Sequence, residues 1–160
     1  MREKIDCFLP CADIADLAET IGDLSASKTV QHIHLLTGDA NNINNIPQGV
    51  ELLETRHPLS TDAILQIAER TDAEYVLIST KPTPVRLGQH SLERFLRVAA
   101  DANAAMVYSD HYSVVEGTVV RHPVIDYQKG SVRDDFDFGQ LVLVNASLLH
   151  EYAATPPAHK

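Results

Sequence analysis

The 160-residue sequence has few basic residues and no long apolar segment. Lys and Arg number 13 against 22 Asp and Glu, a formal charge of −9, and no basic cluster is present to release phosphate counterions, which excludes a general nucleic-acid-binding protein. No apolar run approaches the roughly 18 to 20 residues that span a bilayer, and the first residues lack the apolar core of a signal peptide. We therefore expect a cytoplasmic protein, with the inner face of the membrane as the alternative location.

Common nucleotide-binding and hydrolase motifs are missing too. Gly-x-Gly-x-x-Gly and Gly-x4-Gly-Lys-Ser/Thr do not occur, which argues against a standard dehydrogenase or a P-loop enzyme. Gly-x-Ser-x-Gly, the nucleophile turn of many hydrolases, does not occur either. The only cysteines, Cys7 and Cys11, are interpreted as free thiols in a reducing compartment, because a single Cys-x3-Cys pair is a weak indication of zinc.

The composition is that of a globular protein, with 44% hydrophobic and 22% charged residues. Apolar runs predict strands over residues 5–9, 30–36, 50–54, 74–79, 105–109 and 141–144. Apolar residues at helical spacing predict helices over 14–24 after a cap at Asp13, over 64–68 after a cap at Ser60 or Thr61, and over 91–102. Residues 81–84 read as a loop, and 112–115 with 118–121 as a hairpin.

Strands that alternate with helices predict an α/β fold, a three-layer sandwich with a mostly parallel central sheet. In such sheets ligands bind outside the carboxyl ends of the strands, so function is expected in the turns that follow them. Those turns are residues 10–11, 37–39, 79–81 and 109–111.

Three of these strand ends carry side chains suited to a ligand, each with a simpler structural alternative. Asp39 could accept hydrogen bonds from a nucleobase or ribose, or bond its own turn. Lys81 could neutralise a phosphate as a point charge, or lie solvated in its loop. Asp110 and His111 could bind a metal or move a proton, or cap the turn that follows. The residues alone leave these alternatives open.

His32 and His34 alternate along a predicted strand and therefore point to one face, where two imidazoles could share a metal. A third ligand at suitable spacing is not evident in the sequence. Structural roles in the sheet are therefore favoured for both histidines.

Taken in order, the segments resemble the amino-terminal half of the family-2 glycosyltransferases, which have the A-type nucleotide-sugar-binding fold. Residues 5–10 resemble that family's opening strand with its terminal proline. Residues 30–39 resemble its second strand, whose end carries an acidic turn that touches the base, and residues 74–78 resemble the strand that leads to the metal-binding aspartates. The family's order continues through residues 92–95, 106–110 and 134–144.

The resemblance implies that residues 1–160 form one donor-binding domain, the amino-terminal part of a longer protein. It implies transfer of a sugar from a nucleoside diphosphate donor to a carbohydrate or lipid-linked acceptor in polysaccharide biosynthesis. The residues at the family's functional positions are Pro10, Thr37, Asp39 and Lys81 for the nucleotide, Asp110 for the donor sugar or a metal, and Asp135 or Asp137 for the base unless it lies beyond Lys160.

The sequence departs from the family at its metal ligands. Ser79-Thr80-Lys81 stands where the family has Asp-x-Asp, whose carboxylates hold Mg²⁺ or Mn²⁺ against the diphosphate. We expect Lys81 to supply the positive charge directly, which makes sugar transfer metal-independent. The alternative is a non-catalytic module of the same fold that binds a protein or a glycan. A nucleotidyltransferase is disfavoured because residues 10–13, Pro-Cys-Ala-Asp, contain no glycine-rich phosphate loop.

Overall fold

The computed structural model describes residues 3–124, 129–130, 133 and 136–155. Six of its strands form one sheet in the order β3-β2-β1-β4-β8-β5. Strands β1 to β4 pair in parallel, whereas β8 runs antiparallel to β4 and β5, so the predicted α/β fold with a mostly parallel sheet is confirmed. The strands are β1 (Ile5–Pro10), β2 (Val30–Thr37), β3 (Val50–Glu54), β4 (Tyr75–Ser79), β5 (Met106–Val107) and β8 (Leu141–Asn145).

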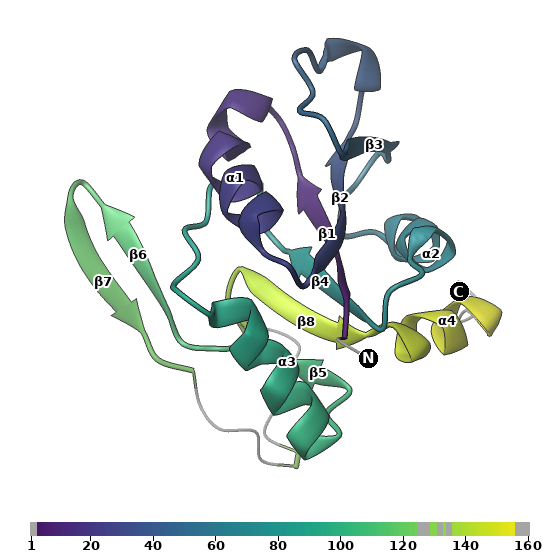
Figure 1. Cartoon of the computed structure of the whole chain (residues 1–160), viewed down its shortest axis with the longest axis vertical. Helices are drawn as coiled ribbons and strands as arrows, with labels where there is room; N and C mark the ends of the chain where they lie inside the picture. The colour runs from purple at the N-terminus through teal and green to yellow at the C-terminus, as the bar shows by residue number, and fades with distance from the viewer. Residues whose placement is uncertain (1–2, 125–128, 131–132, 134–135, 156–160) are drawn as a thin grey trace.

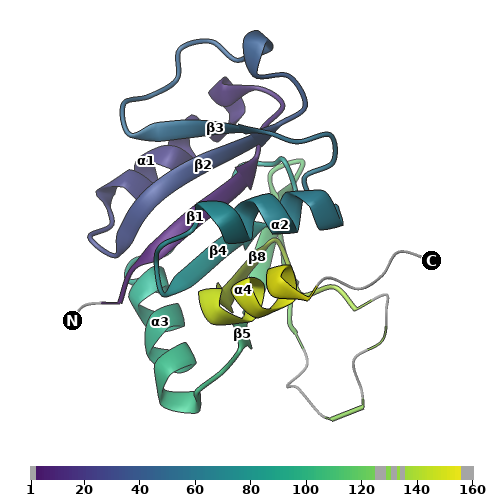
Figure 2. The ribbon, with the colours of Figure 1, turned by 90° about the vertical axis from the view of Figure 1, so that its right-hand side faces the viewer.

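Helices cover both faces of this sheet, which gives three layers (Figures 1 and 2). On one face α1 and α3 bury Leu24 and Leu96, and on the other α2 and α4 bury Ile67 and Leu149. Strand β1 is buried along its whole length because both of its faces are covered. The helices are α1 (Ala18–Ala26), preceded by the 3₁₀ helix η1 (Ile14–Leu17), then α2 (Thr61–Arg70), α3 (Ser91–Ala102) and α4 (Ala146–Ala154).

Two of the predicted helix caps are present. The Asp13 side chain accepts a hydrogen bond from the Ala15 backbone N–H at the start of η1, and the Ser60 side chain accepts one from the Ala63 N–H at the start of α2. Each bond satisfies a backbone donor that has no partner within its own helix. The positions of these two helix starts are therefore encoded locally.

Two elements differ from the sequence analysis. The strand predicted over 105–109 is only Met106–Val107, because the chain leaves the sheet at Tyr108, whose ring packs edge-on against Phe138 at 5.1 Å between centroids. Helix α4 was not predicted. None of the helices within the described residues is long and apolar enough to cross a membrane.

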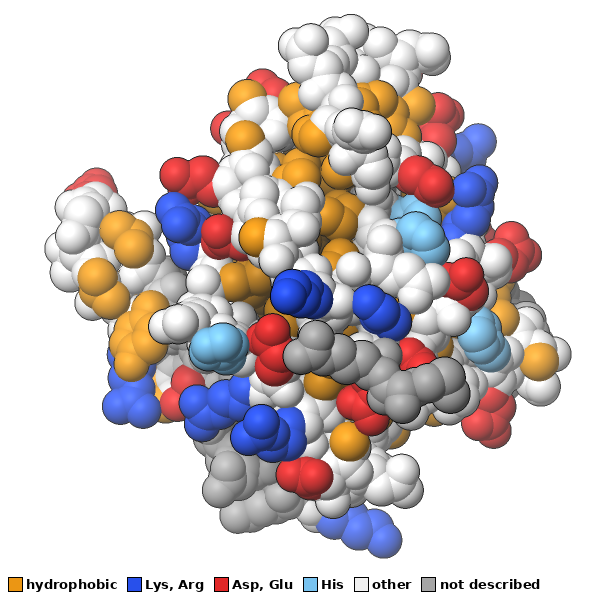
Figure 3. Space-filling model, in the orientation of Figure 1, with side chains coloured by type: hydrophobic (Ala, Val, Ile, Leu, Met, Phe, Trp, Pro, Cys, Tyr) orange, Lys and Arg blue, Asp and Glu red, His pale blue; other side chains and the backbone are white. Residues whose placement is uncertain are grey.

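The predicted hairpin is present as β6 (His111–Val115) and β7 (Thr118–His122), which form a separate two-stranded sheet. It projects from the body of the molecule at the left of Figure 1. Apolar side chains gather on it in Figure 3, and Val114 is 71% exposed. The hairpin therefore lies largely outside the two hydrophobic cores, which lie on the two faces of the six-stranded sheet.

Candidate functional site

The candidate site is the edge of the sheet at which the parallel strands β1, β2 and β4 end, which we call the carboxyl edge. The antiparallel strand β8 begins at the same edge, since Leu141 pairs with Ser79. The hairpin starts close by: a Cβ atom placed on Gly139 would lie 3.0 Å from the His111 Nδ1 atom. Segments far apart in the sequence therefore meet here.

The predicted nucleotide-binding residues at the ends of β1 and β2 differ in their exposure to solvent. Pro10 and Thr37 are buried at the ends of their strands. Asp39 is exposed, and its Oδ1 and Oδ2 atoms accept hydrogen bonds from the Asn41 backbone N–H (2.9 Å) and the Asn42 side-chain amide (2.8 Å). Asp39 thus caps the 3₁₀ helix η2 (Ala40–Asn42), and its contact with a nucleoside stays a prediction.

At the end of β4, Lys81 faces Asp137, with 3.9 Å between the Lys81 Nζ and Asp137 Oδ2 atoms. Their side chains are 52% and 67% exposed, so water screens the attraction and an anionic ligand can compete for the ammonium. The other oxygen of Asp137 accepts a hydrogen bond from the Gly139 N–H at 2.8 Å. The structure thus brings together two of the predicted site residues.

Among the described residues, the side chains at this edge do not fit the divalent cation of an Asp-x-Asp site. Such a cation takes several oxygen ligands, usually with carboxylates among them. Within the described residues, the carboxyl edge holds no group of three metal-ligating side chains. The charge that stands at the end of β4 is the Lys81 ammonium instead.

Gln140 was missed by the sequence analysis and holds the loop that carries Lys81. The Gln140 side-chain amide donates to the Thr83 carbonyl at 2.6 Å. The far side of this loop is bonded to helix α1. The Thr20 hydroxyl accepts a hydrogen bond from the Val85 backbone N–H at 2.8 Å and donates one to the Val85 carbonyl at 2.9 Å. No sequence pattern signals these contacts, because their partners lie 57 to 65 residues apart.

Asp110 lies at the base of the hairpin. Its carboxylate accepts hydrogen bonds from the Val124 backbone N–H (2.8 Å) and the Arg121 guanidinium (3.3 Å). These two bonds, the Val124 bond foremost, lower the pKa of Asp110 below its usual value. Asp110 is therefore ionised at neutral pH. A contact with the donor sugar or a metal stays a prediction.

His111 beside it has a buried ring nitrogen, Nδ1, without a hydrogen-bond partner among the residues that the structure describes. Its ring stacks on that of His122 with 4.8 Å between centroids. Buried polar atoms are normally bonded, so this nitrogen lacks the partner that is usual for a polar atom in a protein interior. Asp135, one of the two predicted bases, lies outside the described residues.

No protein-family model and no curated protein sequence matches this chain. Solved structures do resemble it. A CMP:2-keto-3-deoxy-manno-octonic acid synthetase complexed with CTP matches with a TM-score of 0.56 at 14% identity, over 97% of this chain and 79% of its own. A 4-diphosphocytidyl-2C-methyl-D-erythritol synthase from Anaerococcus prevotii matches with a TM-score of 0.59 at 11% identity, over 99% and 78%.

A third neighbour, the 2-C-methyl-D-erythritol 4-phosphate cytidylyltransferase of Francisella tularensis, has a TM-score of 0.55 at 11% identity, over 94% of this chain and 76% of its own. At such identities the likeness shows the fold alone. The chain therefore shares its α/β fold, with a mostly parallel central sheet, with these three solved structures. Membership of the family-2 glycosyltransferases is not confirmed by these matches.

Proposed function

We propose that the carboxyl edge binds a nucleoside diphosphate sugar and that the chain is the donor-binding domain of a glycosyltransferase. The observation that carries this proposal is the exposed Lys81 ammonium at the end of β4, where a diphosphate needs a positive charge. Ligands in open α/β sheets bind at this edge. Thr37 and Asp39 contact the nucleoside, Pro10 lines its site, and Lys81 binds the diphosphate.

In the proposed reaction, an acceptor hydroxyl oxygen attacks the anomeric carbon of the donor sugar. The bond between that carbon and the diphosphate breaks, and the diphosphate leaves with the electron pair and pairs with Lys81. The hydroxyl proton passes to a carboxylate, Asp137 or Asp135, or one beyond Lys160 in a longer protein. Asp110, ionised and fixed by its hydrogen bonds, orients the donor sugar.

The pair between Lys81 and Asp137 suggests how donor binding prepares this step. A diphosphate carries more charge than one carboxylate, so it replaces Asp137 at the Lys81 ammonium. Asp137 is then available to the acceptor hydroxyl. The long, exposed ion pair supports this exchange, because breaking it costs little.

Nucleotidyl transfer is the second candidate, and the names of the structural neighbours favour it. In that reaction an acceptor oxygen attacks the α-phosphorus of a nucleoside triphosphate, and pyrophosphate leaves. The turn after β1, residues 10–13, is Pro-Cys-Ala-Asp and lacks the glycines that would let backbone amides approach a triphosphate. We therefore rank sugar transfer first.

Calorimetric titration tests the proposal. Uridine, guanosine and thymidine diphosphates and CTP are each titrated with Mn²⁺ and again with excess chelator. We expect one diphosphate to bind in chelator, and Lys81→Ala to weaken that binding at least tenfold, about 1.4 kcal/mol. Lys28→Ala, which removes an exposed lysine between α1 and β2, is the matched control and should leave the affinity unchanged.

Other outcomes separate the candidates. Binding of CTP alone, with pyrophosphate release when an acceptor is added, would favour nucleotidyl transfer. Unchanged affinity in Lys81→Ala would refute the role of that lysine. Failure of every nucleotide to bind would favour a non-catalytic module, for which the exposed apolar hairpin offers a surface.

A further inference from the structure

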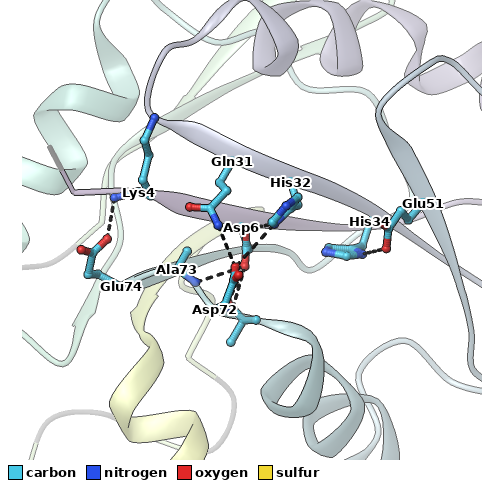
Figure 4. Close-up of polar contacts among 10 residues, drawn as sticks. Lys4, Asp6, Gln31, His32, His34, Glu51, Asp72, Ala73 and Glu74 are labelled. Carbon is cyan, nitrogen blue, oxygen red and sulfur yellow. Dashed lines mark hydrogen bonds and ion pairs between the residues drawn. The ribbon is translucent and has the colours of Figure 1, made fainter.

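A second cluster of chemically active side chains lies at the opposite edge of the sheet, where β1, β2 and β4 begin, which we call the amino edge. Asp6 comes from β1, His32 from β2, and Asp72 from the turn between α2 and β4 (Figure 4). The sequence does not connect these three residues, because its pattern indicates only that His32 and His34 point to the same face of one strand. The fold joins them across 66 residues.

The three side chains present metal-ligand atoms at coordination distances from one another. The His32 Nδ1 atom lies 3.0 Å from Asp6 Oδ1 and 3.6 Å from Asp72 Oδ1, and one ligand atom from each residue falls within 4.8 Å of the others. Ligands about 2.0 to 2.1 Å from a tetrahedral Zn²⁺ are separated by about 3.3 Å. The distances from His32 Nδ1 to Asp6 Oδ1 and to Asp72 Oδ1, 3.0 and 3.6 Å, lie just below and just above this value.

Asp6 is held in the orientation that a ligand needs. Its Oδ2 atom accepts hydrogen bonds from the Thr71 hydroxyl (2.7 Å) and from the backbone N–H groups of Asp72 (3.2 Å) and Ala73 (3.3 Å). Its Oδ1 atom is turned toward His32. Hydrogen bonds that fix one oxygen of a carboxylate while the other faces the metal are typical of the outer shell of metal sites.

Asp72 is held differently: the Gln31 side-chain amide donates at 2.8 Å to Oδ1, the oxygen that also faces His32, so one lone pair of this oxygen is used and another is left for an ion. The Asp72 and His32 side chains are 71% and 43% exposed, so an ion can enter and water can complete its coordination. His34, by contrast, has its Nδ1 atom 3.5 Å from Glu51 Oε2. The ligands that complement His32 are therefore two carboxylates rather than a second imidazole.

Charge compensation is the independent argument for a cation. Asp6 is fully buried, and no lysine or arginine among the described residues forms an ion pair with it. A buried carboxylate is costly unless it is paired and hydrogen-bonded or binds a metal, and the ion-pair partner of Asp6 within the described residues is the His32 imidazole at 3.0 Å, which is charged only when protonated. A divalent ion compensates both carboxylates at once, whereas protonated His32 supplies a single charge.

We propose that Asp6, His32 and Asp72 bind one Zn²⁺ ion at the amino edge, with water at the remaining position. One nitrogen and two oxygen ligands suit a borderline transition-metal ion better than Mg²⁺ or Ca²⁺, which take oxygen ligands. The ion ties β1, β2 and the turn before β4 together. The site lies at the opposite edge from the proposed donor site and does not depend on that function.

Zinc titration of the untagged, chelator-stripped full chain tests this proposal. We expect one equivalent of ZnCl₂ to bind at pH 7.5, and His32→Gln and Asp72→Asn each to weaken the affinity at least tenfold. Glu51→Gln is the matched control, because it removes a nearby carboxylate that is not in the cluster. Both cluster variants alter exposed side chains, and circular dichroism of the metal-free proteins checks that they fold.

Two further readouts locate the ion. Zn²⁺ should raise the midpoint of thermal unfolding of the wild type and of Glu51→Gln, and raise that of His32→Gln by less at the same Zn²⁺ concentration. Co²⁺ in place of Zn²⁺ should give visible d–d bands without thiolate charge-transfer bands, which excludes Cys7 and Cys11. The absence of saturable binding, equal binding in His32→Gln, or thiolate bands would each overturn the proposal.

Discussion

At the amino edge of the sheet the carboxylate of Asp6 is fully buried and accepts hydrogen bonds from three groups of residues 71–73. At the carboxyl edge Lys81 and Asp137 are half exposed, with 3.9 Å between their charged atoms. Removing one member of a buried polar network lowers the stability of the fold strongly, whereas exposed ion pairs contribute little to that stability. The amino edge therefore contributes to stability, and the carboxyl edge keeps charged groups available to a ligand.

Replacing one carboxylate at each edge tests this contrast most severely. We expect Asp6→Ala to lower the free energy of unfolding by about 3–5 kcal/mol, because the donors of residues 71–73 lose their partner in the interior. Asp137→Ala should cost less than about 1 kcal/mol, since its ion pair is exposed. Urea unfolding with excess chelator measures both without bound metal, and equal costs would contradict the contrast.

A glycine substitution tests whether the carboxyl edge has rigid parts. Gly139 has φ +84°, and an added Cβ would lie 3.0 Å from His111 Nδ1, so Gly139→Ala should destabilise the protein by about 1–2 kcal/mol. Gly22→Ala is the control, because it lies in helix α1 with open space around it and should stabilise by about 0.5–1 kcal/mol. Unfolding curves that shift both variants in one direction would contradict the prediction.

The smallest change in stability is expected from protonation of His34. This residue lies in strand β2, which runs from one edge of the sheet to the other. Burial of its imidazole, stacked on Phe8 at 4.6 Å, lowers the pKa of His34. Below about pH 6.5 the unfolded chain therefore binds this proton more readily than the folded one, and stability falls as the pH falls, by at most about 1.4 kcal/mol per pH unit. Above that pH the contribution is fully present.

Thermal unfolding from pH 7.5 to pH 5 measures this dependence. His34→Gln should show a shallower loss of stability on acidification than the wild type, because it removes the group that the unfolded chain protonates. Glu51 lies 3.5 Å from the imidazole, and its charge raises the pKa of His34 and so partly opposes the effect of burial. Asp6 also raises this pKa, and His32 lowers it. His57→Gln controls for the loss of an exposed histidine. An unchanged slope in His34→Gln would contradict the assignment.

Most of the fold could be predicted because its signals are local. Strand β3 was found with its observed bounds, and the caps at Asp13 and Ser60 mark the helix starts, since each depends on residues within one turn. Helix α4 was missed because its sequence was taken only as the tail after a strand. The short β5 was overextended because packing of Tyr108 on Phe138 decides where that strand ends.

The candidate site was predictable residue by residue, but not as an arrangement. Lys81 and Asp137 were each singled out, and only the antiparallel return of β8 beside β4 places them 3.9 Å apart. Gln140 carried no signal, because its partners lie in a loop nearly 60 residues away. At the amino edge, His32 lacked a third ligand in sequence, and Asp6 and Asp72 become its neighbours only through strand pairing.

The sequence by itself determined the class of the protein: alternating apolar strands and amphipathic helices specify a parallel sheet covered on both faces, since burial of apolar surface follows their periodicity. Only the tertiary structure decided which polar groups meet. Ion pairs and ligand clusters depend on strand order and register between segments distant in the chain, as between Asp6 and residues 71–73. Contacts of that kind have no local period, so the assembled sheet is needed to show them.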